Sequence, residues 1–315
     1  MTVSLYLGEE LARYHFGQHH PFGPKRQTAF WDAVRESGLD AWATLCSPVQ
    51  APSSLLERFH TPAYVSLVQD KSQKGGGYLD EGDTPAIQGI HDAASFVVGS
   101  VVHAVREVME KRTRRAFIPI AGLHHARPDQ AAGFCVFNDM GVAIETLKQE
   151  YGLSRIAYID IDAHHGDGVY YPYEADPAVI VADLHEDGRF LYPGTGHAEE
   201  RGTGPALGTK VNVPLQPGAR DEDFFAAWPA VEAFLRAQPP EFVLLQSGVD
   251  SLAGDPLAHL ALSYRAHAFA VTRLIAVAED LCEGRFVVTG GGGYSLSNIA
   301  MGWTAVLRSL LEIHI

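Results

Sequence analysis

Short runs of apolar, β-branched residues recur along this 315-residue chain, and amphipathic stretches with helical spacing lie between them. The runs are apolar on both faces, which is typical of strands in a parallel sheet that helices cover. The predicted strands are 116–120, 156–161, 179–184, 211–215, 242–246 and 286–289. This alternation predicts an α/β fold with one central, mostly parallel sheet flanked by helices.

Apolar spacing and capping residues predict helices between these strands. The predicted helices cover 92–112, 264–282 and 298–311, and another begins after Asn138. Asn138, Ser263 and Ser297 are the predicted N-caps, since their side chains can accept the free N–H groups of a first turn. The glycine-rich stretch 72–82 predicts a surface loop that is too short to divide domains. Because no repeat or linker is evident, we expect one catalytic domain over 1–315.

Acidic residues outnumber basic ones by 38 to 24, which gives a net charge of −14. The excess argues against a nucleic-acid binder and against docking on an anionic membrane, and it is compatible with a cationic partner such as a lysine-rich peptide or a polyamine. The three cysteines form no CxxC motif, which excludes a disulfide scaffold. With no secretory signal pattern and no membrane-length apolar run, we expect a cytoplasmic protein.

Polar residues follow five of the predicted strands at the point where each strand ends. The segments are AGLHH from 121, DAHHGD from 162, DLH from 183, SGVD from 247 and GGGGY from 290. Ligands bind outside the carboxyl ends of parallel strands. We therefore expect these glycine, aspartate, histidine and tyrosine residues to converge on one edge of the sheet.

Asp160, Asp162 and His164 alternate at the end of one strand, so an extended chain projects them to the same side. Carboxylate and imidazole ligands together suit Zn²⁺ or, less specifically, Fe²⁺ or Mn²⁺. Asp250, after another strand, is the expected third ligand. Three protein ligands leave a position for water, as in catalytic sites. The competing interpretation is a pair of ordinary loop aspartates, but an aspartate inside an apolar run is costly unless it is paired or metal-bound.

The adjacent pair His124 and His125 offers a general base for a hydrolytic water, with Asp160 and Asp167 as carboxylates that set the tautomers. Tyr294 follows four glycines, and its phenol could donate a hydrogen bond to a developing oxyanion. The competing interpretation of the glycines is a flexible turn. Three isolated histidines are expected to be structural or solvated, namely His91, His103 and His267.

Together these segments resemble the signatures of the zinc-dependent histone deacetylase family, with the best fit to its class I and acetoin-utilisation branch. The matching segments are 121–126, 133–139, 160–168, 247–256 and 291–298, flanked by 20–26, 59–64 and 193–196. The resemblance runs from about residue 20 to the C-terminus. It implies the single-domain arginase/deacetylase fold.

The resemblance also implies roles for individual residues. One Zn²⁺ would bind Asp162, His164 and Asp250. The catalytic set would be His124, His125, Asp160, Asp167 and Tyr294. The substrate contacts would be Asp83, Gly133, Phe134, Tyr192, Leu257 and Gly292, with Phe134 and Tyr192 as channel walls and Asp83 holding the substrate backbone. A structural K⁺ would bind Asp160, Asp162, His164, Asp183 and Leu184.

The chain departs from the class I pattern at three positions. Leu123 replaces the usual Trp, Tyr192 the usual Phe, and Asp183 a common Ser. The first two bear on the acyl pocket and the channel wall, and the third on the affinity for K⁺. No catalytic group is lost.

The expected reaction is hydrolysis of the amide of N6-acetyl-lysine in a protein or peptide. His125 would be the general base, His124 would tune the electrostatics, and Tyr294 would bind the oxyanion. Within the family, an acetylpolyamine amidohydrolase is the alternative, although the apolar Leu257 stands where an acidic gate would be expected.

Two further alternatives are less favoured. A binuclear ureohydrolase needs more ligands where Gly166 and Leu252 stand, and a catalytically dead binding module would need a lost ligand or a lost tyrosine. The oligomeric state, the preferred acyl length and the physiological substrate stay open.

Overall fold

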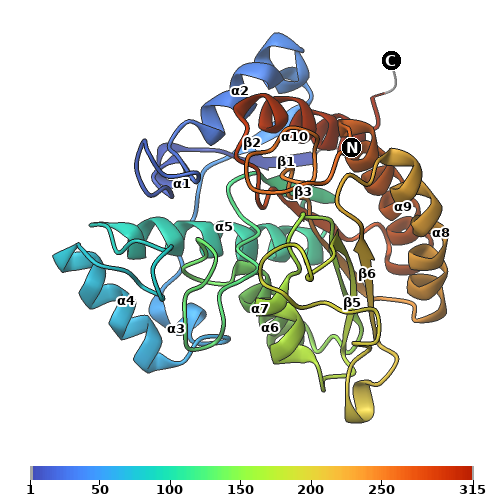
Figure 1. Cartoon of the computed structure of the whole chain (residues 1–315), viewed down its shortest axis with the longest axis horizontal. Helices are drawn as coiled ribbons and strands as arrows, with labels where there is room; N and C mark the ends of the chain where they lie inside the picture. Colours follow the sequence, from blue (N-terminus) through green and yellow to red (C-terminus); the bar gives the residue numbers. More distant parts are fainter. Residues whose placement is uncertain (1–2, 314–315) are drawn as a thin grey trace.

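The computed structural model describes residues 3–313 and has an eight-stranded sheet at its centre (Figure 1). The strands are β1 Val3–Tyr6, β2 Ala43–Cys46, β3 Arg115–Ile118, β4 Ile156–Asp160, β5 Val179–Glu186, β6 Lys210–Leu215, β7 Phe242–Gln246 and β8 Phe286–Thr289. They lie in the order β2-β1-β3-β8-β7-β4-β5-β6, and all neighbouring pairs are parallel. The predicted α/β class with a mostly parallel sheet is confirmed.

Helices cover both faces of the sheet. They are α1 Glu9–Ala12, α2 Arg26–Glu36, α3 Ser53–Leu56, α4 Pro62–Lys74, α5 Ile90–Met109, α6 Asp139–Tyr151, α7 Asp167–Tyr170, α8 Asp221–Ala237, α9 Tyr264–Cys282 and α10 Leu296–Leu310, with 3₁₀ turns at Leu39–Ala41, Tyr171–Tyr173 and Gly204–Ala206. Helix α10 packs against α2 and α9, and α9 against α8, whereas α5 packs against α4 and α6 (Figure 1). The sheet thus lies between two helical layers, which explains why strands such as β4 and β7 are buried along their whole length.

The six predicted strands are present, with small shifts at their ends. Strands β1 and β2 were not predicted. Predicted caps at Asn138 and Ser263 are confirmed, because Asn138 accepts a hydrogen bond from the Gly141 N–H and Ser263 one from the Arg265 N–H. The predicted cap at Ser297 is wrong: the Ser295 side chain accepts the Asn298 N–H, so α10 begins at Leu296.

Two other boundaries differ from the sequence-based expectation. Helix α5 covers Ile90–Met109 rather than 92–112. The predicted loop 72–82 begins only at Gly75, since α4 continues to Lys74. Residues 1–2 and 314–315 of the predicted domain lie outside the described residues. Within 3–313 no helix is long and apolar enough to cross a membrane, and all three cysteines are free thiols.

The register of the sheet brings the ends of its central strands level. Asp160, the last residue of β4, pairs with Asp183 of β5 on one side and with Gln246 of β7 on the other, and Gln246 pairs with Thr289 of β8. The segments that follow these strands therefore leave from one edge of the sheet. This edge carries the polar residues that the sequence analysis singled out.

Candidate active site

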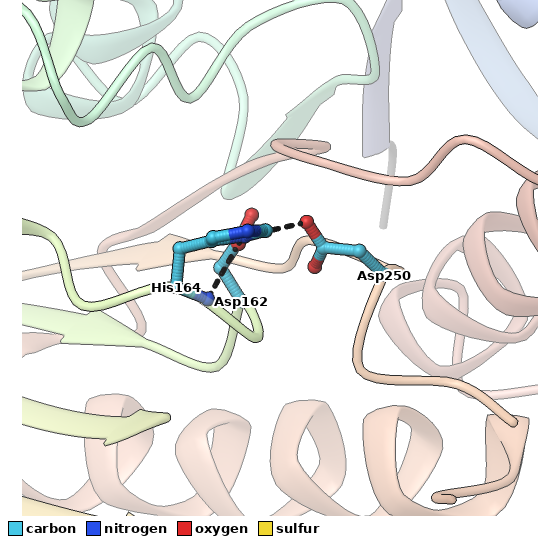
Figure 2. Close-up of side chains that lie close together, drawn as sticks. All are labelled: Asp162, His164 and Asp250. Carbon is cyan, nitrogen blue, oxygen red and sulfur yellow. Dashed lines mark hydrogen bonds and ion pairs between the residues drawn. The ribbon is translucent and has the colours of Figure 1, made fainter. Parts of the chain in front are cut away.

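Asp162, His164 and Asp250 form a buried group at this edge (Figure 2). One ligand atom from each residue lies within 4.8 Å of the others. His164 Nδ1 lies 3.1 Å from Asp162 Oδ1 and 3.1 Å from Asp250 Oδ2. Asp162 and His164 follow β4 and Asp250 follows β7, so the pairing of these two strands brings the group together.

The surrounding backbone fits closely around the two carboxylates. Asp162 Oδ2 accepts hydrogen bonds from Gln246 Nε2 at 2.7 Å and from the Gly292 N–H at 2.8 Å. A Cβ atom added at Gly248 would overlap the Asp162 carboxylate, and one added at Gly292 would overlap that of Asp250. Glycine at these two positions therefore leaves room for two carboxylates but for no further side chain.

The electrostatics of the group favour a bound cation. Burial, together with the charge of Asp162, raises the pKa of Asp250 to about 7. Burial lowers the pKa of His164, but hydrogen bonds to Asp162 and Asp250 outweigh it and raise the pKa to about 10. A proton on His164 Nδ1 thus offsets two buried carboxylates. A metal cation held by the same three atoms would do so as well, so the donor set fits a metal that prefers nitrogen and oxygen ligands.

Two histidine–aspartate pairs lie beside this group. His124 Nδ1 is 2.8 Å from Asp160 Oδ2, and His125 Nδ1 is 2.7 Å from Asp167 Oδ1. Burial lowers the pKa of His124, but the charges of Asp160 and Asp162 outweigh it and raise the pKa to about 10. Burial and the charge of His124 lower the pKa of His125 to about 4, against the opposing effect of Asp167.

The two histidines are therefore set to opposite protonation states. Asp167 can only accept at His125 Nδ1, so that nitrogen carries the hydrogen and a neutral His125 has its Nε2 free to take up a proton. His124 is held as a cation next to Asp160, whose own pKa is raised to about 6 by burial. The roles of His125 as a base and of His124 as an electrostatic group stay predictions.

Two of the predicted channel residues, Gly133 and Tyr192, lie against the His125 ring, and Tyr294 packs against a third, Phe134. The Tyr294 ring meets the Phe134 ring edge-on at 5.8 Å between centroids, and the Tyr192 ring lies 5.1 Å from that of His125. Gly133 has a φ of +53°, and a Cβ there would collide with the His125 ring. Glycine is therefore required at position 133, because a side chain would strain the backbone at this φ and would prevent the close approach of the His125 ring.

The mouth of the site contains a cavity of about 470 Å³, which Asp83, Gly133 and Tyr192 line together. Burial and the neighbouring Asp80 raise the pKa of Asp83 to about 6. Three other predicted substrate contacts, Phe134, Leu257 and Gly292, are not among the residues that line this cavity. The Leu257 N–H donates to Asp255 Oδ1, and the predicted substrate contact of Leu257 stays a prediction.

Asp183 and Leu184, predicted for the potassium site, lie buried on β5. The Asp183 carboxylate lies 2.6 Å from His185 Nδ1 and accepts the Gly166 N–H at 2.9 Å. His185 Nε2 in turn lies 2.9 Å from the Gly196 carbonyl oxygen. Both ring nitrogens of His185 lie within hydrogen-bond distance of acceptors. Burial lowers the pKa of His185, but the charge of Asp183 outweighs it and raises the pKa.

Sequence reasoning missed several residues that hold the site. Asp255 accepts the Tyr294 N–H at 2.8 Å, and Gln246 binds Asp162. The buried Arg26 donates to the carbonyl oxygens of Gly293 and Gly291 at 2.9 and 2.6 Å, and its guanidinium lies over the Phe22 ring. The glycine run before Tyr294 is therefore held in place and is not a flexible turn.

Comparisons with known proteins agree with this geometry. A family model described as the histone deacetylase domain matches residues 20–310. The chain is 33% identical to the acetoin utilization protein AcuC of Bacillus subtilis over 95% of this chain and 78% of that protein. It is 34% identical to a probable deacetylase of Archaeoglobus fulgidus (94% and 82% covered), and 33% identical to the histone deacetylase clr6 of Schizosaccharomyces pombe (96% and 75%). The crystal structure of the HDA15 HD domain superposes with a TM-score of 0.90 at 28% identity, over 99% of this chain and 90% of that one.

Proposed function

This chain belongs to the histone deacetylase family, and from that premise we propose that it is a zinc-dependent hydrolase that cleaves N6-acetyl-lysine, in a protein or peptide, to lysine and acetate. The observation that carries the proposal is one constellation. A buried Asp162–His164–Asp250 group lies beside His125, and the His125 ring lies against Tyr192 and Gly133, two residues that line the cavity. The Tyr294 ring packs against Phe134.

Asp162, His164 and Asp250 would hold the zinc ion, which when bound would polarise the acetyl carbonyl and lower the pKa of the attacking water. His125 Nε2 takes the proton from that water, while Asp167 holds the Nδ1–H and stabilises the imidazolium that results. The same proton then passes from His125 to the departing lysine nitrogen. The amine then leaves neutral and the acid carries the new oxygen with its remaining hydrogen. That second proton passes to the freed lysine amine or to solvent, which leaves acetate.

His124 and Tyr294 act on the charge that develops during the attack. The charged His124 offsets Asp160 and Asp162 without exchanging a proton. Burial, together with the charges of Asp250 and Asp162, raises the pKa of Tyr294 well above its usual value. The phenol therefore keeps its hydrogen at neutral pH and donates it to the oxyanion.

Substrate selection rests on the cavity at the mouth. Phe134 and Tyr192 are proposed to flank the lysine methylenes above Gly133 and Gly292, and each buried methylene contributes about 0.8 kcal/mol. Asp83 is proposed to hold the peptide backbone, and Leu257 to contact the substrate from the segment after Asp250.

We also propose a structural potassium ion at Asp160, Asp162, His164, Asp183 and Leu184. Support comes from Asp160 and Asp183, two buried carboxylates paired across β4 and β5. We further propose that 1–315 act as one catalytic domain and that the protein works in the cytoplasm, to which its free thiols are suited.

The decisive experiment compares kcat/KM for an acetyl-lysine peptide with that for acetylputrescine, using zinc-loaded protein. We expect the peptide to be preferred. A large preference for acetylputrescine would show that the substrate is an acetylpolyamine rather than an acetyl-lysine peptide. If neither compound released acetate, the proposed hydrolase activity itself would be contradicted.

A further inference from the structure

The two histidine–aspartate pairs differ in what holds their carboxylates. Asp160 accepts hydrogen bonds from the His124 ring, the Tyr158 hydroxyl and the Asp162 N–H, all inside the protein. In the Asp167 carboxylate, Oδ1 binds His125. The other oxygen, Oδ2, has one hydrogen-bond donor among residues 3–313, namely Arg127 Nη2 at 3.2 Å.

The fold fixes the backbone from which Arg127 reaches Asp167. The Arg127 N–H donates to the Gln130 carbonyl at 2.8 Å, and the Thr61 N–H donates to the Pro128 carbonyl at 2.8 Å. Asn138 Nδ2 donates both to the Ala126 carbonyl at 2.8 Å and to the Gly168 carbonyl at 3.0 Å. One amide group thus ties the segment that carries His125 and Arg127 to the segment that carries Asp167. The backbone positions of both Arg127 and Asp167 are therefore fixed by hydrogen bonds, which keeps the two charged side chains within reach of each other.

The two partners of this ion pair differ in their exposure to solvent. The Asp167 side chain is fully buried, whereas that of Arg127 is 51% exposed and lines the mouth cavity with Asp83 and Tyr192. An ion pair with one exposed partner contributes little to stability, typically about 0–1 kcal/mol. Its effect on orientation is larger, because within residues 3–313 no side chain other than Arg127 donates a hydrogen bond to the carboxylate oxygen that His125 leaves free.

We propose that Arg127 is a positioning residue for the reaction: it anchors Asp167 Oδ2 so that Oδ1 keeps the His125 ring in the orientation and tautomer of a general base. This inference rests on the proposed function, in which His125 takes the proton from water. Within residues 3–313 the Arg127 side chain has one ion pair, with Asp167, and none with the metal group, so its proposed effect on the reaction runs through Asp167.

The test measures acetate release by Arg127→Ala and Arg127→Lys beside the unaltered protein. Loss of a group that orients a catalytic residue costs about 10-fold or more in activity. We expect Arg127→Ala to lose that much in kcat while KM for the peptide, the metal content and the melting temperature stay unchanged. Arg127→Lys should recover part of kcat, because its ammonium can still reach the carboxylate as a point charge.

The exposed position of Arg127 permits a second readout. Added guanidinium ions should restore part of the kcat of Arg127→Ala, because the space that the Arg127 guanidinium leaves is open to solvent. They should not change the kcat of the unaltered protein. The matched control is Arg155→Ala. The Arg155 side chain is 49% exposed and pairs with Glu241. Arg155 directly precedes β4, so it lies at the edge of the sheet opposite to the candidate site. This control should keep full kcat and should not respond to guanidinium.

The outcomes separate this inference from the proposed function. An unaltered, zinc-loaded protein that releases no acetate contradicts the proposed function. If that protein is active and Arg127→Ala has the same kcat, the positioning role is refuted. A loss that appears in KM alone, or in melting temperature together with metal content, also refutes it. Should Arg127→Ala fold poorly, Arg127→Gln, which keeps hydrogen-bond donors without the charge, takes its place with the same criteria.

Discussion

The phenol of Tyr294 permits a sharp prediction, because Tyr294→Phe removes one oxygen atom and leaves the ring. Among the described residues no group accepts a hydrogen bond from this hydroxyl, whereas the backbone N–H is held by Asp255. The folded protein therefore loses no internal hydrogen bond in the variant, and the ring keeps its edge-on contact with Phe134. We expect the melting temperature and the metal content to be unchanged.

The rate should change greatly, because the hydroxyl is proposed to donate only to the oxyanion. Removing one such donor costs about 100- to 1,000-fold in kcat, or roughly 3–4 kcal/mol of transition-state stabilisation. KM for the acetyl-lysine peptide should change little, since the ground-state amide carries no full negative charge.

The assay is steady-state acetate release by zinc-loaded Tyr294→Phe and unaltered protein. Tyr151→Phe is the matched control. Tyr151 is the last residue of α6, and its hydroxyl lies 3.4 Å from a Glu110 carboxylate oxygen. The kcat of this variant should not change. If Tyr294→Phe turned over the peptide at the unaltered rate, the oxyanion role would be refuted and Tyr294 would be only a wall of the site.

Three further predictions concern the metal, the mouth and the pH dependence of stability. Asp162→Ala and Asp250→Ala should each lose the bound metal, as measured by elemental analysis, together with activity; a variant that keeps a full equivalent of metal would contradict the ligand assignment. Asp83→Ala should lower kcat/KM for the peptide more than for acetylputrescine, and equal losses would argue against a contact with the peptide backbone. Burial lowers the pKa of His60 from its ordinary 6.5 to about 4, and its Nε2 accepts the Asn138 N–H. Since the unfolded chain then binds the extra proton, stability that is complete above pH 6.5 is lost as the pH falls toward 4. In urea unfolding, the unaltered protein should lose about 2 kcal/mol more than His60→Gln between pH 7 and pH 5; equal losses would contradict the low pKa.

Most strands found from the sequence, such as β4 and β7, are buried at every residue, because a run of apolar residues in a covered parallel sheet has no polar interruption. Burial alone does not decide the outcome, since the partly buried β6 was predicted and the buried β1 was not. Strand β2 shows why others were missed. Its residues are half-buried or exposed at the edge of the sheet, and only pairing with β1 makes it a strand. The same limit applies to the cap of α10. Ser295 and Ser297 are chemically equivalent, and only the backbone geometry selects Ser295.

The candidate site divides in a similar way. The alternation of Asp162 and His164 is local, so the sequence alone places both on one side of the chain. The residues that hold the site act across long separations: Arg127 binds Asp167 40 positions later, and Arg26 binds Gly293 267 positions later. No spacing rule connects such pairs, and they become visible only when the sheet brings their segments together.

The central claim is that a single metal ion at Asp162, His164 and Asp250 supports amide hydrolysis, and titration of metal-free protein with zinc tests it most directly. Acetate release from an acetyl-lysine peptide is measured at each addition. We predict no activity in the chelated protein and a linear rise that ends at one equivalent of zinc per chain. Activity that survives complete removal of metal, or an end point at two equivalents, would contradict the account.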